Sequence, residues 1–229
     1  MSAPDAMAGN RSILRRASGR YAYTTLDGHE QRGSEEFTLL VHPDGSRTLS
    51  IWHDLRARDA QFTVVLRVAQ NFRPLEAYVS YWNAGAFKGS ALMRADGKRL
   101  TTDSRGPQGV LHLEQNVPEQ FSIGTHPVAA DGWHGWYLSS DESSGTLSIL
   151  TMEASGDLTL PVKGSLNSLP IERIGDETIA VAAGRFKTTH YRLASVNDLW
   201  VIDEPDRLVV RSIIAARGLK YELTRFESR

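Results

Sequence analysis

The stretch Leu219-Lys220-Tyr221-Glu222-Leu223-Thr224-Arg225-Phe226 sets the pattern from which the fold class follows. Leu219, Tyr221 and Leu223 alternate along it with Lys220 and Glu222, and then with a threonine. A period of two places the apolar side chains on one face of an extended chain and the polar side chains on the other. The stretch therefore predicts a β-strand with one buried and one solvated face near the end of the chain.

The same alternation recurs through most of the sequence. It continues upstream through runs that are separated by short polar connections, at residues 37–41, 48–53, 61–69, 75–83, 186–193, 199–202 and 208–214. Turn signals such as Asp96-Gly97, Ser144-Gly145 and Ser155-Gly156 punctuate these runs. A dozen or more strands with short turns predict one meander-like antiparallel sheet, which curls when it becomes this large. We expect an all-β fold, a large curved antiparallel barrel or half-barrel.

The end of the chain also resembles a known group of domains. The matching pieces are Gly184-Arg185-Phe186-Lys187-Thr188, Leu199-Trp200-Val201, Leu208-Val209-Val210-Arg211 and Tyr221-Glu222-Leu223. They resemble bacterial half-barrel domains of unknown function that are similar to the lipoprotein-carrier fold, a curved antiparallel sheet around a plug of helix or loop. The resemblance implies a curved sheet with an apolar concave face, and it implies no catalytic residues.

One long segment, residues 117–137, does not alternate. Its prolines and glycines limit any helix there, namely Pro118, Gly124, Pro127, Gly132 and Gly135. We expect this segment to plug or cover the open side of the curved sheet. Residues 1–17 are small, polar and basic, which predicts a flexible arm, or one short helix at residues 12–17. Residues 18–229 then form a single domain.

Composition narrows the classes of function. The net charge is −1, so nothing points to a nucleic-acid partner. No apolar run approaches the ~20 residues of a membrane helix, and residues 1–16 have no apolar core of a secretory signal, so the expected location is cytoplasmic, away from membranes. The chain has no cysteine, which excludes disulfides and thiolate chemistry. The oligomeric state stays open, with a homodimer as one alternative.

Titratable and aromatic side chains are concentrated in residues 125–137. A histidine that pairs with a carboxylate can move protons near neutral pH, so His126, Asp131 and His134 are candidate acid–base residues, with the hydroxyl of Tyr81 as a fourth. The alternative is structural, with the aspartate capping a turn and the histidines bonded to backbone. Eight residues between the two histidines match no familiar zinc pattern, so no metal site is expected.

Tryptophans suggest a binding site. Four of them around one cavity would form an aromatic box for a flat ligand. The alternative is ordinary core packing. An arginine within an apolar strand binds an anionic group if it points inward, and is solvated if it points outward. The candidate ligand-binding residues are Trp52, Arg67, Trp82, Trp133, Trp136 and Tyr137.

No serine-hydrolase elbow, phosphate-binding glycine loop or dinucleotide fingerprint is present, so any chemistry should need no cofactor. The prediction is a cofactor-independent enzyme of the lyase or isomerase type, which transfers protons on a small apolar or aromatic molecule. The alternative is a non-catalytic binding or carrier protein for an apolar ligand. A third class, a structural domain with a filled interior, also remains.

Overall fold

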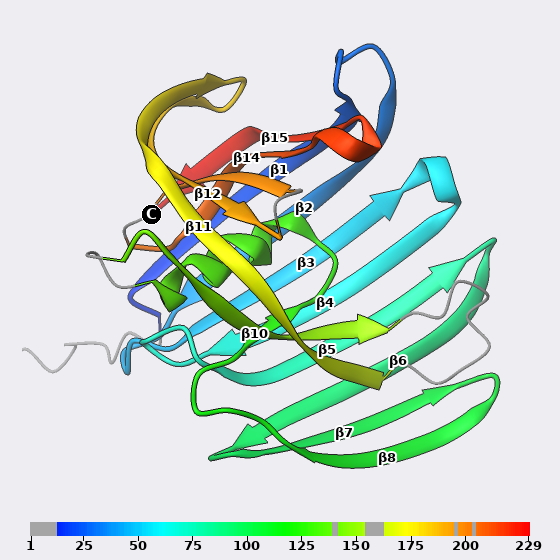
Figure 1. The fold of residues 1–229 in the computed structure, drawn as a ribbon. Helices are drawn as coiled ribbons and strands as arrows, with labels where there is room; N and C mark the ends of the chain where they lie inside the picture. Colours follow the sequence, from blue (N-terminus) through cyan, green and yellow to red (C-terminus); the bar gives the residue numbers. More distant parts are fainter. Residues whose placement is uncertain (1–12, 139–141, 154–162, 195–196, 203–204) are drawn as a thin grey trace, which may run out of the picture.

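The period-two pattern becomes one sheet of fifteen strands in the part of the chain that the computed structural model describes, residues 13–138, 142–153, 163–194, 197–202 and 205–229 (Figure 1). The strands are β1 (Arg15–Thr25), β2 (Gln31–Val41), β3 (Arg47–Leu55), β4 (Ala60–Val68), β5 (Pro74–Asn83), β6 (Ala86–Asp96), β7 (Arg99–Gly106), β8 (Gly109–Asn116), β9 (Ser122–Gly124), β10 (Ser144–Glu153), β11 (Lys163–Val181), β12 (Gly184–Leu193), β13 (Asn197–Ile202), β14 (Leu208–Ile214) and β15 (Leu219–Ser228). Three 3₁₀ helices accompany them: η1 (Arg56–Arg58), η2 (Val128–Tyr137) and η3 (Ala215–Arg217).

The sheet is curved and not closed, with β8 at one end and β9 at the other. Consecutive strands pair antiparallel from β1 to β8 and from β10 to β15, and β1 and β15 pair with each other in the middle of the sheet, so that Tyr23 lies opposite Tyr221. Only β9 and β10 are parallel among the described strands. The all-β, curved antiparallel half-barrel predicted from the alternation is confirmed.

The first strand begins earlier than the sequence suggested. β1 starts at Arg15, inside the segment for which we expected an arm or a short helix, because it pairs on both sides: Arg15 lies opposite Val41, and Ala17 lies opposite Ser228. The expectation of a helix was therefore wrong for residues 15–17. Residues 1–12 of the expected arm lie outside the described part of the chain.

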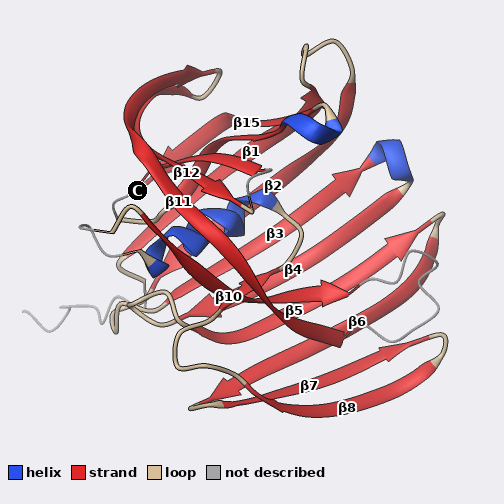
Figure 2. Ribbon diagram, viewed as in Figure 1, coloured by secondary structure: helices blue, strands red, loops and turns tan. Residues whose placement is uncertain are grey.

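Residues 128–137 occupy the concave side of the sheet, where η2 contacts β9, β10, β13 and β14 (Figure 2). The segment is a ten-residue helix, which corrects the expectation that its glycines would limit one. The glycines instead permit close packing. A Cβ on Gly132 would lie 1.9 Å from the carbonyl oxygen of Arg207, and one on Gly135 would lie 3.0 Å from the ring of Tyr191.

The core lies between the concave face and η2. The inward-facing residues of the strands and the apolar side of η2 form one buried cluster, which includes Tyr21, Leu39, Leu66, Trp133 and Leu150. No helix of the described residues is long and apolar enough to cross a membrane.

Candidate functional site

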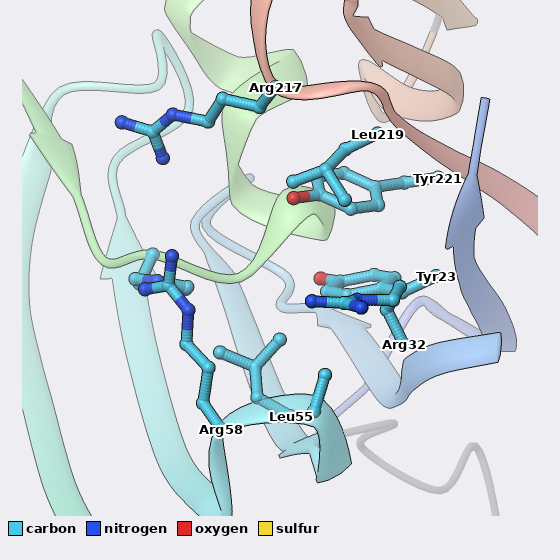
Figure 3. A pocket seen from close by; sticks show the side chains of 9 residues that line it. Tyr23, Arg32, Leu55, Arg58, Arg217, Leu219 and Tyr221 are labelled. Carbon is cyan, nitrogen blue, oxygen red and sulfur yellow. The ribbon is translucent and has the colours of Figure 1, made fainter. Parts of the chain in front are cut away.

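A pocket of about 410 Å³ opens where three turns of the chain meet at one end of the strands. Helices η1 and η3 lie near each other at this end, and the loop that leads into η2 reaches the same place (Figure 2). The lining residues come from four strands, two helices and this loop: Tyr23, Arg32, Leu55, Ala57, Arg58, His126, Arg217, Leu219 and Tyr221 (Figure 3).

One wall of the pocket is aromatic and apolar. Tyr23 of β1 and Tyr221 of β15 are directly paired across the two strands, and their rings stack with centroids 4.0 Å apart. Figure 3 shows the two rings one above the other, with their hydroxyl groups on the same side. Leu55 and Leu219 complete this wall. Such a surface suits the apolar part of a small molecule.

Three arginines surround the opening, and two of them stand on turns of the same construction. Arg58 is the last residue of η1 and Arg217 the last residue of η3. A residue with positive φ follows each of them, Asp59 at 48° and Gly218 at 62°, and its N–H bonds back to the first residue of the helix. Each helix thus connects the two strands of a hairpin, β3 and β4 or β14 and β15, and carries an arginine as its last residue. In the sequence, these turns correspond to Ala57-Arg58-Asp59 and Ala216-Arg217-Gly218. Neither arginine was among the predicted site residues.

The arginines differ in their partners. Arg32 forms an ion pair with Glu30 at 2.7 Å. Among the described residues, the guanidinium groups of Arg58 and Arg217 form no ion pair or hydrogen bond. In Figure 3 they reach toward the same side of the pocket, the side on which the tyrosine hydroxyls lie. The positive charges of Arg58 and Arg217 at the opening are therefore not neutralised by direct contact with any described carboxylate.

His126, on the loop that leads into η2, lines the pocket and is exposed to solvent. Its ring stacks on Phe62 of β4, with centroids 4.8 Å apart and planes 15° apart, and it lies 5.3 Å from the ring of His53. Desolvation by the protein atoms around the ring lowers the pKa of His126, and the nearby positive charges of Arg58 and Arg217 act in the same direction, against the opposing effect of Asp131. The shift favours the neutral form of the imidazole.

A buried carboxylate lies behind this wall. Glu35 of β2 is fully buried and accepts three hydrogen bonds, from the hydroxyl of Tyr23 and from the backbone N–H groups of Val128 and Ala129. Burial raises the pKa of Glu35 to about 7, although the three hydrogen bonds favour the ionised form. With this pKa, Glu35 can gain or lose a proton near neutral pH. It is linked to the pocket through its hydrogen bond with the hydroxyl of Tyr23, which lines the pocket.

The structure places the four predicted catalytic residues in different environments. His126 is the one that lines the pocket. Tyr81 stacks on the same Phe62 ring, with centroids 4.4 Å apart, and does not line the pocket. His134 is buried, with its Nδ1 2.6 Å from the hydroxyl of Ser122 and its Nε2 3.4 Å from the carboxylate of Asp131. The expected pairing of Asp131 with His134 is present, but on η2 and not in the wall of this pocket.

The predicted ligand-binding residues do not converge on one cavity. Trp133 is 2% exposed, and its indole N–H donates to the carbonyl of Asp206 at 2.8 Å. Trp52 and Trp82 are 45% exposed and face away from the core, as does the exposed Arg67. The remaining two, Trp136 and Tyr137, line a separate hollow of about 440 Å³ at the other end of η2.

No group of three or more His, Cys, Asp or Glu side chains in the described ranges is arranged to hold a metal ion. The chemistry that the pocket itself can perform is electrostatic binding by arginine, stacking by tyrosine, and hydrogen bonding or proton exchange by His126 and the Tyr23–Glu35 pair.

Comparison with known proteins supports the fold. No family model matches the sequence, and no curated protein matches it. A β-barrel-like protein from Brucella abortus, with a domain of unknown function called DUF1849, is similar in structure, with a TM-score of 0.53 and 7% sequence identity, over 95% of this chain and 99% of its own. A DUF1089 family protein from Pseudomonas aeruginosa gives a TM-score of 0.45 at 11% identity, over 77% of this chain and 86% of its own. The first of these likenesses shows a β-barrel-like fold along most of the chain, which agrees with the curved sheet that the C-terminal resemblance implied.

Proposed function

We propose that the pocket binds a small organic anion, with its apolar body against the tyrosines and its acidic group among the arginines. The observation that carries the proposal is the pair Arg58 and Arg217, which stand on two matching turns around one apolar-walled space. Guanidinium groups favour carboxylates and phosphates because they offer several donors in a planar fork. The sequence predicted a small apolar or aromatic ligand; the proposal keeps its small size and apolar body and adds a negative charge.

The local environment supports an anion over a neutral or cationic ligand. Like charges repel one another, and a bound anion removes that repulsion for Arg58 and Arg217. The carboxylate of Glu35 lies deeper and is already occupied by three donors. The lowered pKa of His126 favours its neutral form, and an imidazole carries no negative charge that would repel an anion. A ligand with its acidic group at the opening and its apolar part inside matches this distribution.

Affinity for a matched pair of probes tests the proposal. Hexanoate and phenylacetate are compared with the neutral hexanamide and phenylacetamide by isothermal titration calorimetry at low ionic strength. The acids should bind at least ~10-fold more tightly, because charge-assisted hydrogen bonds contribute about 1.5–3 kcal/mol. Equal binding of acids and amides, or no binding of either acid at millimolar concentration, would contradict the proposal.

Variants of the turns give the second arm of this test. Arg58→Gln combined with Arg217→Gln should weaken hexanoate binding by at least ~10-fold. Arg56→Gln is the matched control, because Arg56 lies on the same helix, pairs with Asp54 at 2.9 Å and does not line the pocket. An equal effect of the control would mean that general surface charge, and not this site, attracts the anion.

A second candidate function is proton transfer without a cofactor, of the lyase or isomerase type. The hydrogen bond from Tyr23, which lines the pocket, to Glu35 favours it. A carboxyl group with a pKa of about 7 is suited to accept a proton relayed through the tyrosine hydroxyl. Exchange of carbon-bound hydrogen of a bound acid with deuterated water, present in the wild type and lost in Glu35→Gln, tests this function; no exchange in the wild type contradicts it for that acid.

A further inference from the structure

His53 is a buried polar side chain that the fold leaves without partners. It is 0% exposed on β3, and neither ring nitrogen has a hydrogen-bond partner among the described residues. Its neighbours are rings: Tyr23 at 4.7 Å, Phe62 at 5.6 Å and His126 at 5.3 Å between centroids. Buried polar groups in native proteins are nearly always paired, and two of the rings around His53, those of Tyr23 and His126, line the pocket, so the unpaired imidazole points to a binding partner that reaches it from the pocket.

The ring of His126 lies 5.3 Å from the ring of His53, and His126 also lines the pocket. The backbone of His126 has a φ of 77°, and Pro127 follows it. A side chain other than glycine rarely adopts this left-handed conformation, and a residue before proline favours an extended one. Strain of this kind persists where the surrounding structure holds a residue for a function. The position thus combines a constrained backbone with a place between the pocket and His53.

We propose that His126 covers a second, inner subsite, in which His53 binds a neutral hydroxyl or amide group at the end of the ligand remote from its acidic group. This inference rests on the proposed anion pocket for the identity of that remote end. Movement of the His126 ring would join the pocket to the nitrogens of His53. The ligand class becomes an organic acid that carries a hydroxyl or amide several atoms from its acidic group.

The chemistry around His53 selects a neutral group. A neutral imidazole offers one donor and one acceptor, which is the complement of a hydroxyl or a primary amide. Glu35 lies directly opposite His53 on β2, and the hydroxyl of Tyr23 is engaged with that carboxylate. A second carboxylate placed there would face Glu35 at close range, whereas a hydroxyl would not be repelled. Burial also lowers the pKa of His53 to about 2, so the ring is neutral before the ligand arrives.

An experiment without ligand tests whether the ring of His126 shields His53 from solvent. In the wild type, the imidazole ¹⁵N signals of His53, which report protonation of the ring itself and not of Glu35 opposite it, should show no protonation between pH 8 and 5, whereas the exposed His112 should titrate as an internal reference. His126→Gly suits the left-handed backbone and removes the ring. In that variant water should reach His53, and its signal should shift in the same pH range. A His53 signal that stays unchanged in a folded His126→Gly protein overturns the proposal. His53→Phe assigns the signal by its loss.

A pair of probes tests the subsite. 6-Hydroxyhexanoate should bind the wild type at least ~10-fold more tightly than hexanoate, since its hydroxyl would satisfy His53. His53→Phe should abolish this preference and leave hexanoate binding within about twofold. His53→Leu, a smaller replacement, should do the same, so the result does not depend on one variant folding.

The outcomes separate the two proposals. Hexanoate that binds equally with or without the added hydroxyl contradicts the inner subsite and leaves the anion pocket standing. Failure of both probes to bind contradicts the anion pocket, and the titration of His53 in His126→Gly then still decides whether His126 is a cover. A hydroxyl preference that survives in both His53 variants overturns the role of His53.

Discussion

The carboxylate of Glu35 accepts a hydrogen bond of 2.9 Å from the backbone N–H of Val128, so strand β2 holds the first turn of η2. A second bond of the same length comes from Ala129. The first N–H groups of a helix have no partner within it, and a buried helix end needs such partners from elsewhere. A single side chain on the sheet therefore fixes the position of the plug helix and, through Pro127, of His126 at the pocket.

Glu35→Gln should lower the free energy of unfolding by about 2–3 kcal/mol at neutral pH. The amide would present its NH₂ group to one of the backbone N–H donors, which leaves buried donors unsatisfied. Urea denaturation followed by tryptophan fluorescence measures the change. Glu36→Gln is the control, because Glu36 faces solvent on the same strand and lies 3.9 Å from Arg20; it should change stability by less than about 0.5 kcal/mol. Equal effects of the two variants would contradict the capping role.

The pH dependence of stability carries a signature of Glu35. Its pKa is raised from 4.5 to about 7 by burial, so the folded state holds this proton more tightly than the unfolded state does. The contribution is fully present below about pH 4.5 and is lost as the pH rises through 7, by at most about 3 kcal/mol. Unfolding free energies measured from pH 4.5 to 8 should show a decline that is absent in Glu35→Gln; parallel curves would sink the prediction.

His53 affects the pH dependence of stability in the opposite direction to Glu35. Its pKa is lowered from 6.5 to about 2 by burial, so its contribution is present above pH 6.5 and is lost progressively as the pH falls toward 2. His53→Phe removes the titrating group and keeps an aromatic ring beside Tyr23 and Phe62. The variant should therefore lose less stability than the wild type between pH 6.5 and 4.5. Thermal unfolding at several pH values checks this, and an unchanged acid sensitivity would show that His53 is already protonated in the folded state.

Gly132→Ala should destabilise the protein by about 3 kcal/mol, at the upper end of the cost of overpacking. The added methyl group would lie 1.9 Å from a backbone oxygen of Arg207, so η2 would have to move away from the sheet. Gly124→Ala is the matched control, since its methyl group would meet the flexible end of Ile149 at 3.1 Å. Denaturation curves that give the two variants similar stabilities would disprove the close packing of η2.

Trp133→Phe and Trp52→Phe separate packing from binding. Trp133 is buried and donates to the carbonyl of Asp206, so Trp133→Phe should cost about 1–3 kcal/mol through a lost hydrogen bond and a smaller side chain. Trp52 is 45% exposed, and its replacement should cost less than about 1 kcal/mol. Neither change should alter hexanoate affinity, because neither residue lines the anion pocket. A large loss of hexanoate affinity in the Trp133 variant would instead support the hypothesis that tryptophans form an aromatic box around the ligand.

Alternation predicted β2 to β5 and β12 to β15, because a half-buried strand imposes a period of two on its own residues, whereas no alternating run was assigned to β6, β7, β8, β10 or β11. The interruption at residues 117–137 located the plug for the same reason, and the cluster of histidines brought His126 to attention. The helix within the plug was not predictable from local preference. Gly132 and Gly135 are unfavourable in an isolated helix, and tertiary contact with β12–β14 reverses this preference.

For the site, too, part was determined by the sequence and part by the tertiary structure. The sequence by itself determined an all-β chain, its turns and the residues that carry titratable groups. The proposals of catalysis, location and a homodimer stay predictions. Only the tertiary structure decided that Arg58 and Arg217, far apart in the chain, stand at one opening, and that Tyr23 stacks on Tyr221. The physical reason is that strand pairing between β1 and β15 is a contact between the two ends of the chain. Periodicity reports which face of a strand is buried, but it carries no information about which distant strand lies beside it.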